Sequence, residues 1–121
     1  MTTAQLEEKV YSALISDAQL IGLLPKKDKS IFHLQAPAQY PDYPILVYTP
    51  ISDVPVLHGD NVEKLHRVTM RIHIVNGTPA IYESVRRIMA ELGFTRTQTT
   101  QFFEDGRKIQ AVDFYIISEV E

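Results

Sequence analysis

The sequence predicts an α+β fold, with helices on one face of a largely antiparallel or mixed sheet of about four to five strands. Apolar residues recur with helical spacing near the start of the chain and again at residues 79–92, whereas β-rich runs lie between and after these stretches. The chain has 121 residues, of which 45% are hydrophobic, and this length suits one hydrophobic core. We therefore expect a single domain over residues 1–121, with two main helices.

Two helices open the predicted fold. Thr2 and Gln5 have the spacing of a capping box, and the apolar stripe that follows them predicts a helix over about residues 3–15. Asp17 can cap a second, shorter helix, which Pro25 ends.

Proline-rich segments surround the first predicted strands. Residues 31–34 form a short strand candidate, and the three prolines in residues 35–44 indicate an extended linker. Residues 45–51 are β-rich, and Pro50 places the end of this strand at a sheet edge or a bulge. Residues 52–64 are then predicted to be a long loop, a kind of segment that is usually functional or disordered.

The clearest strand and the clearest helix follow one another in the sequence. From His66 to Val75, successive residues point to opposite faces of a strand, and His66 shares the face of the apolar residues. Thr78 and Pro79 supply an N-cap and a favourable first residue for a helix over about residues 79–92.

The second face of the predicted sheet is apolar, although helices are expected to cover only the first face. Asp105-Gly106 predicts a hairpin turn, and the strand after it, residues 109–117, is apolar on both sides, as are residues 45–51. One explanation is that residues 35–44 fold over this second face. The other is that it packs against another subunit. Polar side chains around such a contact would help to select the correct partner. They are Arg67, Arg71, His73 and Asp113.

Composition argues against several classes of function. The net charge is −3, with four Lys/Arg against seven Asp/Glu in residues 1–60 and eight of each in residues 61–121, so no basic stripe is present to bind nucleic acid. The absence of cysteine excludes disulfides and thiolate zinc clusters. The glycines are isolated, and neither a phosphate-binding loop nor a nucleophile motif is present. We therefore expect no enzymatic activity, no cofactor and no membrane-spanning segment.

Three of the four histidines lie between residues 57 and 75, which raises the question of a metal site. His66 and His73 are seven residues apart, so on a regular strand they face opposite sides. His58 and Asp60 could approach His66, but zinc needs three or four convergent ligands and further hydrogen bonds that orient them. We therefore predict no metal site, with His66 at a strand entrance and His73 facing solvent or a partner.

The order of the segments points to a protein family. After the N-terminal helix come SDAQLIGLLP, the proline-rich IFHLQAPAQYPDYPILVYTPIS, an HGD loop, an alternating strand, the helix IYESVRRIMAELGF and a hairpin ending DFYI. This order resembles that of the tail-completion, or tail-terminator, proteins of long-tailed bacteriophages and prophages. The resemblance covers about residues 6–117 and depends on element order and loop placement.

The resemblance implies a virion protein at the head-proximal end of the tail, assembled in the cytoplasm of the bacterial host. Its subunits would be monomeric until they form a six-fold ring on the finished tail tube. That ring would stop polymerisation of the tail-tube protein and present a surface to the head-completion protein, while phage DNA passes through its lumen. Heterologous contacts between copies form a ring when the rotation closes. The candidate contact residues are His58, Asp60, Glu63, Arg67, Arg71, His73, Glu104, Asp105, Arg107, Asp113 and Tyr115.

Alternative interpretations stay open. Charged loop tips are often simply solvated, and the same order of elements could serve a head-completion or neck connector protein. A small ferredoxin-like module that binds a ligand or RNA would use Tyr48, His73 and Tyr115 as a stacking platform. An enzyme that uses His58, Asp60 and His66 to hold a metal is a further alternative.

Overall fold

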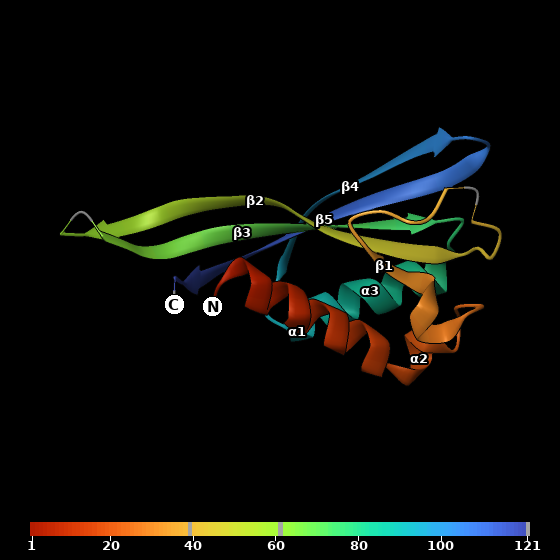
Figure 1. Ribbon diagram of the computed structural model, residues 1–121, viewed down its shortest axis with the longest axis horizontal. Coiled ribbons are helices and arrows are strands. Elements are labelled where there is room, and N and C mark those ends of the chain that lie inside the picture. The colour runs from red at the N-terminus through yellow and green to blue at the C-terminus, as the bar shows by residue number, and fades with distance from the viewer. Residues whose placement is uncertain (39, 61, 121) are drawn as a thin grey trace.

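A mixed five-stranded sheet with three α-helices makes up this protein, whose computed structural model describes residues 1–38, 40–60 and 62–120. The strand order is β1-β2-β3-β5-β4, with β1 parallel to β2 and all other neighbours antiparallel. The helices lie on one face of the sheet (Figure 1), which confirms the predicted α+β fold. The strands are β1 (Ile31–His33), β2 (Ile45–Gly59), β3 (Val62–Val75), β4 (Thr95–Glu104) and β5 (Arg107–Glu119).

The helices begin at the residues that the sequence indicates. Thr2 forms a complete capping box with Gln5 at the start of α1 (Thr3–Ser16). Asp17 accepts a hydrogen bond from the Leu20 amide, at 2.9 Å, at the start of α2 (Ala18–Ile21). The Thr78 side chain caps α3 (Pro79–Glu91), and Gly93 follows that helix with a φ of +95°. Within the described ranges, no helix has the length and apolar character needed to span a lipid bilayer.

The main core lies between the sheet and the helices. On β3 the predicted alternation is confirmed, because every second side chain from His66 to Ile74 is buried toward the helices. α1 and α3 supply the opposite wall of this core, and burial of each large apolar side chain is worth about 1.5–3 kcal/mol. The main contributors from the two helices are Leu6, Val10, Leu14, Ile81, Val85 and Met89.

A second, smaller core lies on the other face of the sheet. Phe32 and described residues of the 34–44 segment, including Tyr40 and Tyr43, pack over a buried apolar cluster there. The cluster consists of Ile45, Val47, Val75 and Ile109. The chain therefore covers this part of the face itself, as the first of the two explanations states. The expectation that another subunit covers it is wrong for these residues.

Residues 52–64, predicted to be a loop, instead belong largely to a long β-hairpin. The β2–β3 pairing runs from Ile45 opposite Val75 to Gly59 opposite Val62, with register shifts after Pro50, Pro55 and Leu57. The distal half of this hairpin, residues 52–60 and 62–67, extends past the helices (Figure 1) and is called the arm below.

Pro50 does not end β2. The backbone N–H that proline lacks would point toward the β1 side, away from the hydrogen bonds between β2 and β3. The Tyr48 carbonyl accepts a hydrogen bond from the Leu34 amide at 3.0 Å, so Tyr48 presents its backbone groups toward β1. Pro50 lies two residues further along, before the first register shift, and therefore faces the same way. A proline at an edge removes no hydrogen bond from the ladder. The strand passes through Pro50 with a bulge and continues into the arm.

Phe114→Ala tests the main core, since this β5 side chain is only 2% exposed. The free energy of unfolding is expected to fall by about 3–5 kcal/mol, because the substitution leaves a cavity. Ile117→Ala, at a 51%-exposed position on the same strand, should change it by only about 0.5 kcal/mol. Urea denaturation followed by circular dichroism measures both, and equal losses would contradict this assignment of the core.

Candidate functional site

The predicted contact residues lie in three separate regions of the structure. One group is on the arm, a second is on the face of the sheet opposite the helices, and a third is at or next to the β4–β5 turn. In that order the groups are His58, Asp60, Glu63 and Arg67; Arg71, His73, Asp113 and Tyr115; and Glu104, Asp105 and Arg107.

An ion pair occupies the middle of the second face. Arg71 donates from Nε to Asp113 Oδ1 at 2.7 Å and from a terminal nitrogen to Oδ2 at 3.0 Å. Gln98 donates to the same Oδ2 at 3.1 Å. The hydrogen bond from Arg71 lowers the pKa of Asp113, against the opposing effect of burial. Both oxygens of this carboxylate are hydrogen-bonded within the chain. Its role in the fold is therefore structural, whether or not a partner also contacts it.

The predicted stacking platform does not form. Tyr48 lies on the helix side of the sheet, with its ring centroid 5.8 Å from that of Tyr11 and 5.0 Å from that of His33. His73 and Tyr115 follow the alternation of β3 and β5 on the opposite face. Burial and the charge of Arg71 lower the pKa of His73, which favours its neutral form.

The β4–β5 turn is confirmed as a tight two-residue hairpin. Asp105 and Gly106 have φ values of +52° and +76°, and Glu104 pairs with Arg107. The Arg107 guanidinium lies 4.2 Å from the centre of the Tyr43 ring. Arg107 therefore packs onto the 34–44 segment, whereas Glu104 and Asp105 remain exposed.

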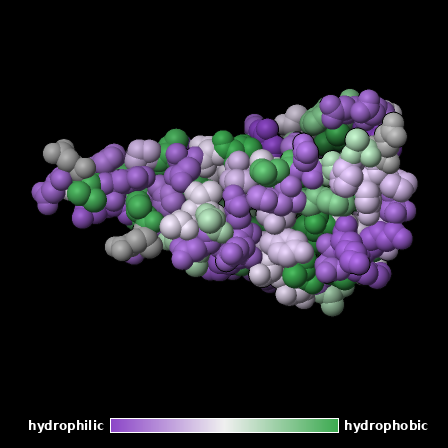
Figure 2. All heavy atoms as spheres, viewed as in Figure 1, coloured by the Kyte–Doolittle hydropathy of each residue, from purple (hydrophilic) through white to green (hydrophobic). Residues whose placement is uncertain are grey.

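The arm carries exposed apolar side chains near its end. Leu57 and Val62 are 51% and 56% exposed, and Figure 2 shows apolar side chains among hydrophilic ones along the arm. A hollow of about 350 Å³ lies beside them, bounded also by Leu65 and Val120 and by the charged residues Glu63, Lys64 and Glu119. A two-stranded hairpin on its own is marginally stable in water. This surface is therefore suited to being covered by another molecule.

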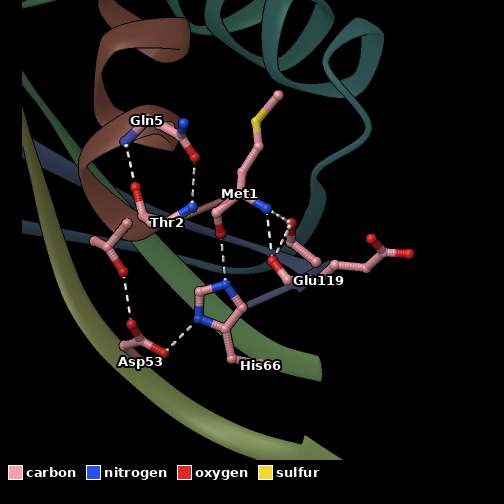
Figure 3. Close-up of polar contacts among 8 residues, drawn as sticks. Met1, Thr2, Gln5, Asp53, His66 and Glu119 are labelled. Atoms are coloured by element: carbon pink, nitrogen blue, oxygen red, sulfur yellow. Dashed lines mark hydrogen bonds and ion pairs between the residues drawn. The ribbon is translucent and has the colours of Figure 1, made fainter. Parts of the chain in front are cut away.

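The base of the arm is joined to the start of α1 through His66, a buried residue with 4% exposure. His66 Nδ1 lies 2.7 Å from Asp53 Oδ1, and Nε2 lies 2.7 Å from the Met1 carbonyl oxygen (Figure 3). Thr3 donates to the other carboxylate oxygen of Asp53 at 2.6 Å. The sequence placed His66 at a strand entrance but gave no sign of Asp53, which reaches it across a bulged hairpin.

His66 needs two protons to make both contacts. The Asp53 carboxylate and the Met1 carbonyl can only accept hydrogen bonds, so each ring nitrogen must donate. Burial lowers the pKa of His66, but the hydrogen bonds to Asp53 and Met1 outweigh burial and raise it overall. The hydrogen bonds from Thr3 and His66 lower the pKa of Asp53. The result is an imidazolium–carboxylate pair between the arm and the body.

Among the residues that the structure describes, one group of three potential metal ligands converges. It consists of Asp53, Glu63 and His66, whose donor atoms lie within 4.8 Å of one another. His58 and Asp60, the partners that the sequence suggested for His66, do not belong to this group.

Arg71→Met tests the ion pair on the second face. It leaves the Asp113 carboxylate, which is 94% buried, without its main partner, and should lower the free energy of unfolding by about 1–3 kcal/mol. Arg67→Met is the matched control, because Arg67 is exposed on the same strand and forms no ion pair within the described ranges. Urea denaturation of both variants would contradict the assignment if Arg67→Met were equally destabilising.

In buffer that contains a metal chelator, the free energy of unfolding of the protein should fall as the pH rises above 6.5. The pKa of His66 is raised above its usual 6.5, so its contribution is fully present below pH 6.5 and is lost as the pH rises through the folded-state pKa. His73 has a lowered pKa and acts in the other direction, opposing folding only as the pH falls below 6.5. Urea denaturation between about pH 6 and pH 9 should show the loss in the wild type and not in His66→Gln. The same slope in both proteins would exclude His66 as its origin.

Comparison with known proteins gives no assignment. No protein-family model matches the sequence, and no curated protein matches it. A proposal of function therefore depends on the geometry of the arm, the second face and the β4–β5 turn.

Proposed function

We propose that this protein is a structural subunit of the tail of a long-tailed bacteriophage or prophage. It caps the head-proximal end of the tail tube as a ring of identical subunits, stops tube polymerisation and joins the tube to the head. The tail-tube protein and the head-completion protein are then its partners, and phage DNA only passes through the ring. The closest alternative is a neighbouring neck or head-completion protein, which would use the same surfaces.

The arm is the observation that carries this proposal. Its strands leave the part of the sheet that α1 and α3 cover, and its end exposes Leu57 and Val62. Exposed apolar groups on an extended hairpin are typical of surfaces that another chain covers.

The two ends of the sheet differ, which suits a ring of identical subunits. The arm projects at one end, whereas the β4–β5 turn lies at the other end of the long axis (Figure 1). β4 is the last strand in the sheet order, so in the described part of the chain its outer edge has no partner strand. Contacts between unlike surfaces are heterologous, and such contacts produce closed rings when the rotation closes.

The charge of the chain also fits a conduit for DNA. The net charge is −3, and the Arg71 guanidinium on the second face is paired with Asp113. A strongly basic lumen would bind a polyanion and retain it. A neutral or mildly acidic subunit allows DNA to pass.

The arm can be tested with a double variant, Leu57→Asp and Val62→Asp. Charges at these exposed positions should leave the fold intact and reduce binding to the ends of purified tail tubes by at least about tenfold, since they oppose burial at a contact. Leu34→Asp is the matched control, because Leu34 is 57% exposed away from the arm and has a φ of +71°, which aspartate tolerates. Electron microscopy of labelled protein on tubes measures the binding.

Deletion of the gene gives the decisive phenotype. Phage particles that lack the protein should contain tubes of uncontrolled length that are not joined to heads. Tails of normal length joined normally to heads would rule the proposal out, and tails of normal length without heads would favour the head-completion alternative.

A further inference from the structure

We propose that Asp53, Glu63 and His66 form a binding site for one divalent transition-metal ion, such as zinc, at the base of the arm. The sequence predicted no metal site, because three convergent ligands with orienting hydrogen bonds were not visible in it. The structure supplies both features. The inference goes beyond the proposed function and holds whether or not the protein belongs to a phage tail.

The histidine is held in the orientation that a metal ligand needs. Its Nε2 lies 2.7 Å from the Met1 carbonyl, so a hydrogen bond there fixes both the ring and the tautomer. Its Nδ1 lies 2.7 Å from Asp53 Oδ1 (Figure 3), and a carboxylate oxygen of Glu63 lies within 4.8 Å of a ring nitrogen. Histidines that bind metals usually donate their second ring N–H to a carbonyl or a carboxylate in this way.

The two carboxylates complete a three-ligand set. The donor atoms of Asp53, Glu63 and His66 lie within 4.8 Å of one another. Donors held about 2.1 Å from one zinc ion in tetrahedral geometry lie about 3.4 Å apart. Coordination would therefore open the 2.7 Å separation of His66 Nδ1 and Asp53 Oδ1 and close the widest pair of donors by at most about 1.4 Å. The orientation of the Asp53 carboxylate is already restrained, because the Thr3 hydroxyl donates a hydrogen bond to its second oxygen at 2.6 Å.

Glu63 distinguishes a metal site from a simple ion pair. The His66–Asp53 pair is complete without it, and Glu63 makes no direct hydrogen bond to His66 within the described ranges. It nevertheless places a carboxylate oxygen, the third donor atom, within 4.8 Å of the donor atoms of Asp53 and His66 on a partly buried surface. A divalent cation between the three groups would replace the proton on Nδ1 and neutralise the second carboxylate.

The ligand types indicate the class of metal. Imidazole nitrogen favours zinc, copper, iron and nickel, whereas all-oxygen sites favour magnesium and calcium. One nitrogen and two carboxylate oxygens therefore select a transition ion, with water in the remaining position. Such an ion would tie β2 and β3 at the point where the arm meets the start of α1.

Isothermal titration calorimetry of the untagged protein with zinc chloride near pH 7.5 tests the site. One ion should bind per chain, and zinc should raise the thermal unfolding midpoint as expected for a ligand of the folded state. Magnesium chloride at the same concentration should bind at least about tenfold more weakly. Cobalt chloride should give visible absorption bands typical of a low-coordinate nitrogen and oxygen site.

Three variants decide which residues hold the ion. Glu63→Gln should weaken zinc binding by at least about tenfold without disturbing the His66–Asp53 pair, and His66→Gln should abolish it. His58→Gln, an exposed histidine on the same arm, is the control and should bind as the wild type does. If His66→Gln fails to fold by circular dichroism, Glu63→Gln still tests the site. Absence of zinc binding, binding unchanged in Glu63→Gln, or binding lost in His58→Gln would overturn the proposal.

Discussion

The paired strands β2 and β3 extend beyond the helices and the 34–44 segment that cover them. The exposed arm and the polar contacts at its base both result from this difference in length. Near Ile45 and Val75 the sheet is covered on both faces, by the helices on one side and by Phe32 and residues of the 34–44 segment on the other. Toward Gly59 and Val62 neither cover continues. Backbone hydrogen bonds hold the two strands together there, but the apolar side chains of Leu57 and Val62 remain 51% and 56% exposed.

Two kinds of contact within the chain occupy much of the second face. They make this face less suitable as a contact surface than the sequence suggested. Aromatic side chains cover its apolar part, and the buried Asp113 carboxylate is neutralised by Arg71 in its polar part. Removing either partner of such a pair is costly, and Arg71 and Asp113 are direct cross-strand partners in the register of β3 against β5. The chain itself therefore covers or pairs the part of this face near Ile45, Val75 and Asp113. A partner is more favourably accommodated at the arm or at the β4 edge, where backbone or apolar groups are open.

The sequence predicted those elements whose signals are local. The capping box at Thr2, the helix after Thr78, the alternation of β3 and the Asp105-Gly106 turn each depend on residues a few positions apart. The arm was mistaken for a loop because proline is unfavourable in a strand, and only the strand register shows that Pro50 lies on the outer edge. The Asp53–His66 pair was missed for a similar reason. It joins residues across a hairpin with register shifts, which no spacing rule in the sequence encodes.

His66 contributes to the stability of the fold and also joins the arm to the start of α1. The alternation that separates it from His73 also places it on the helix side, where the Met1 carbonyl and Asp53 meet it. Both neighbours accept hydrogen bonds, so the position needs a positive charge: two protons on the ring, or one proton and a metal ion. In either state that charge links the start of α1 to the strands of the arm. This polar contact therefore joins the arm to the body near the point where the main apolar core ends, in addition to the backbone pairing of β3 with β2 and β5.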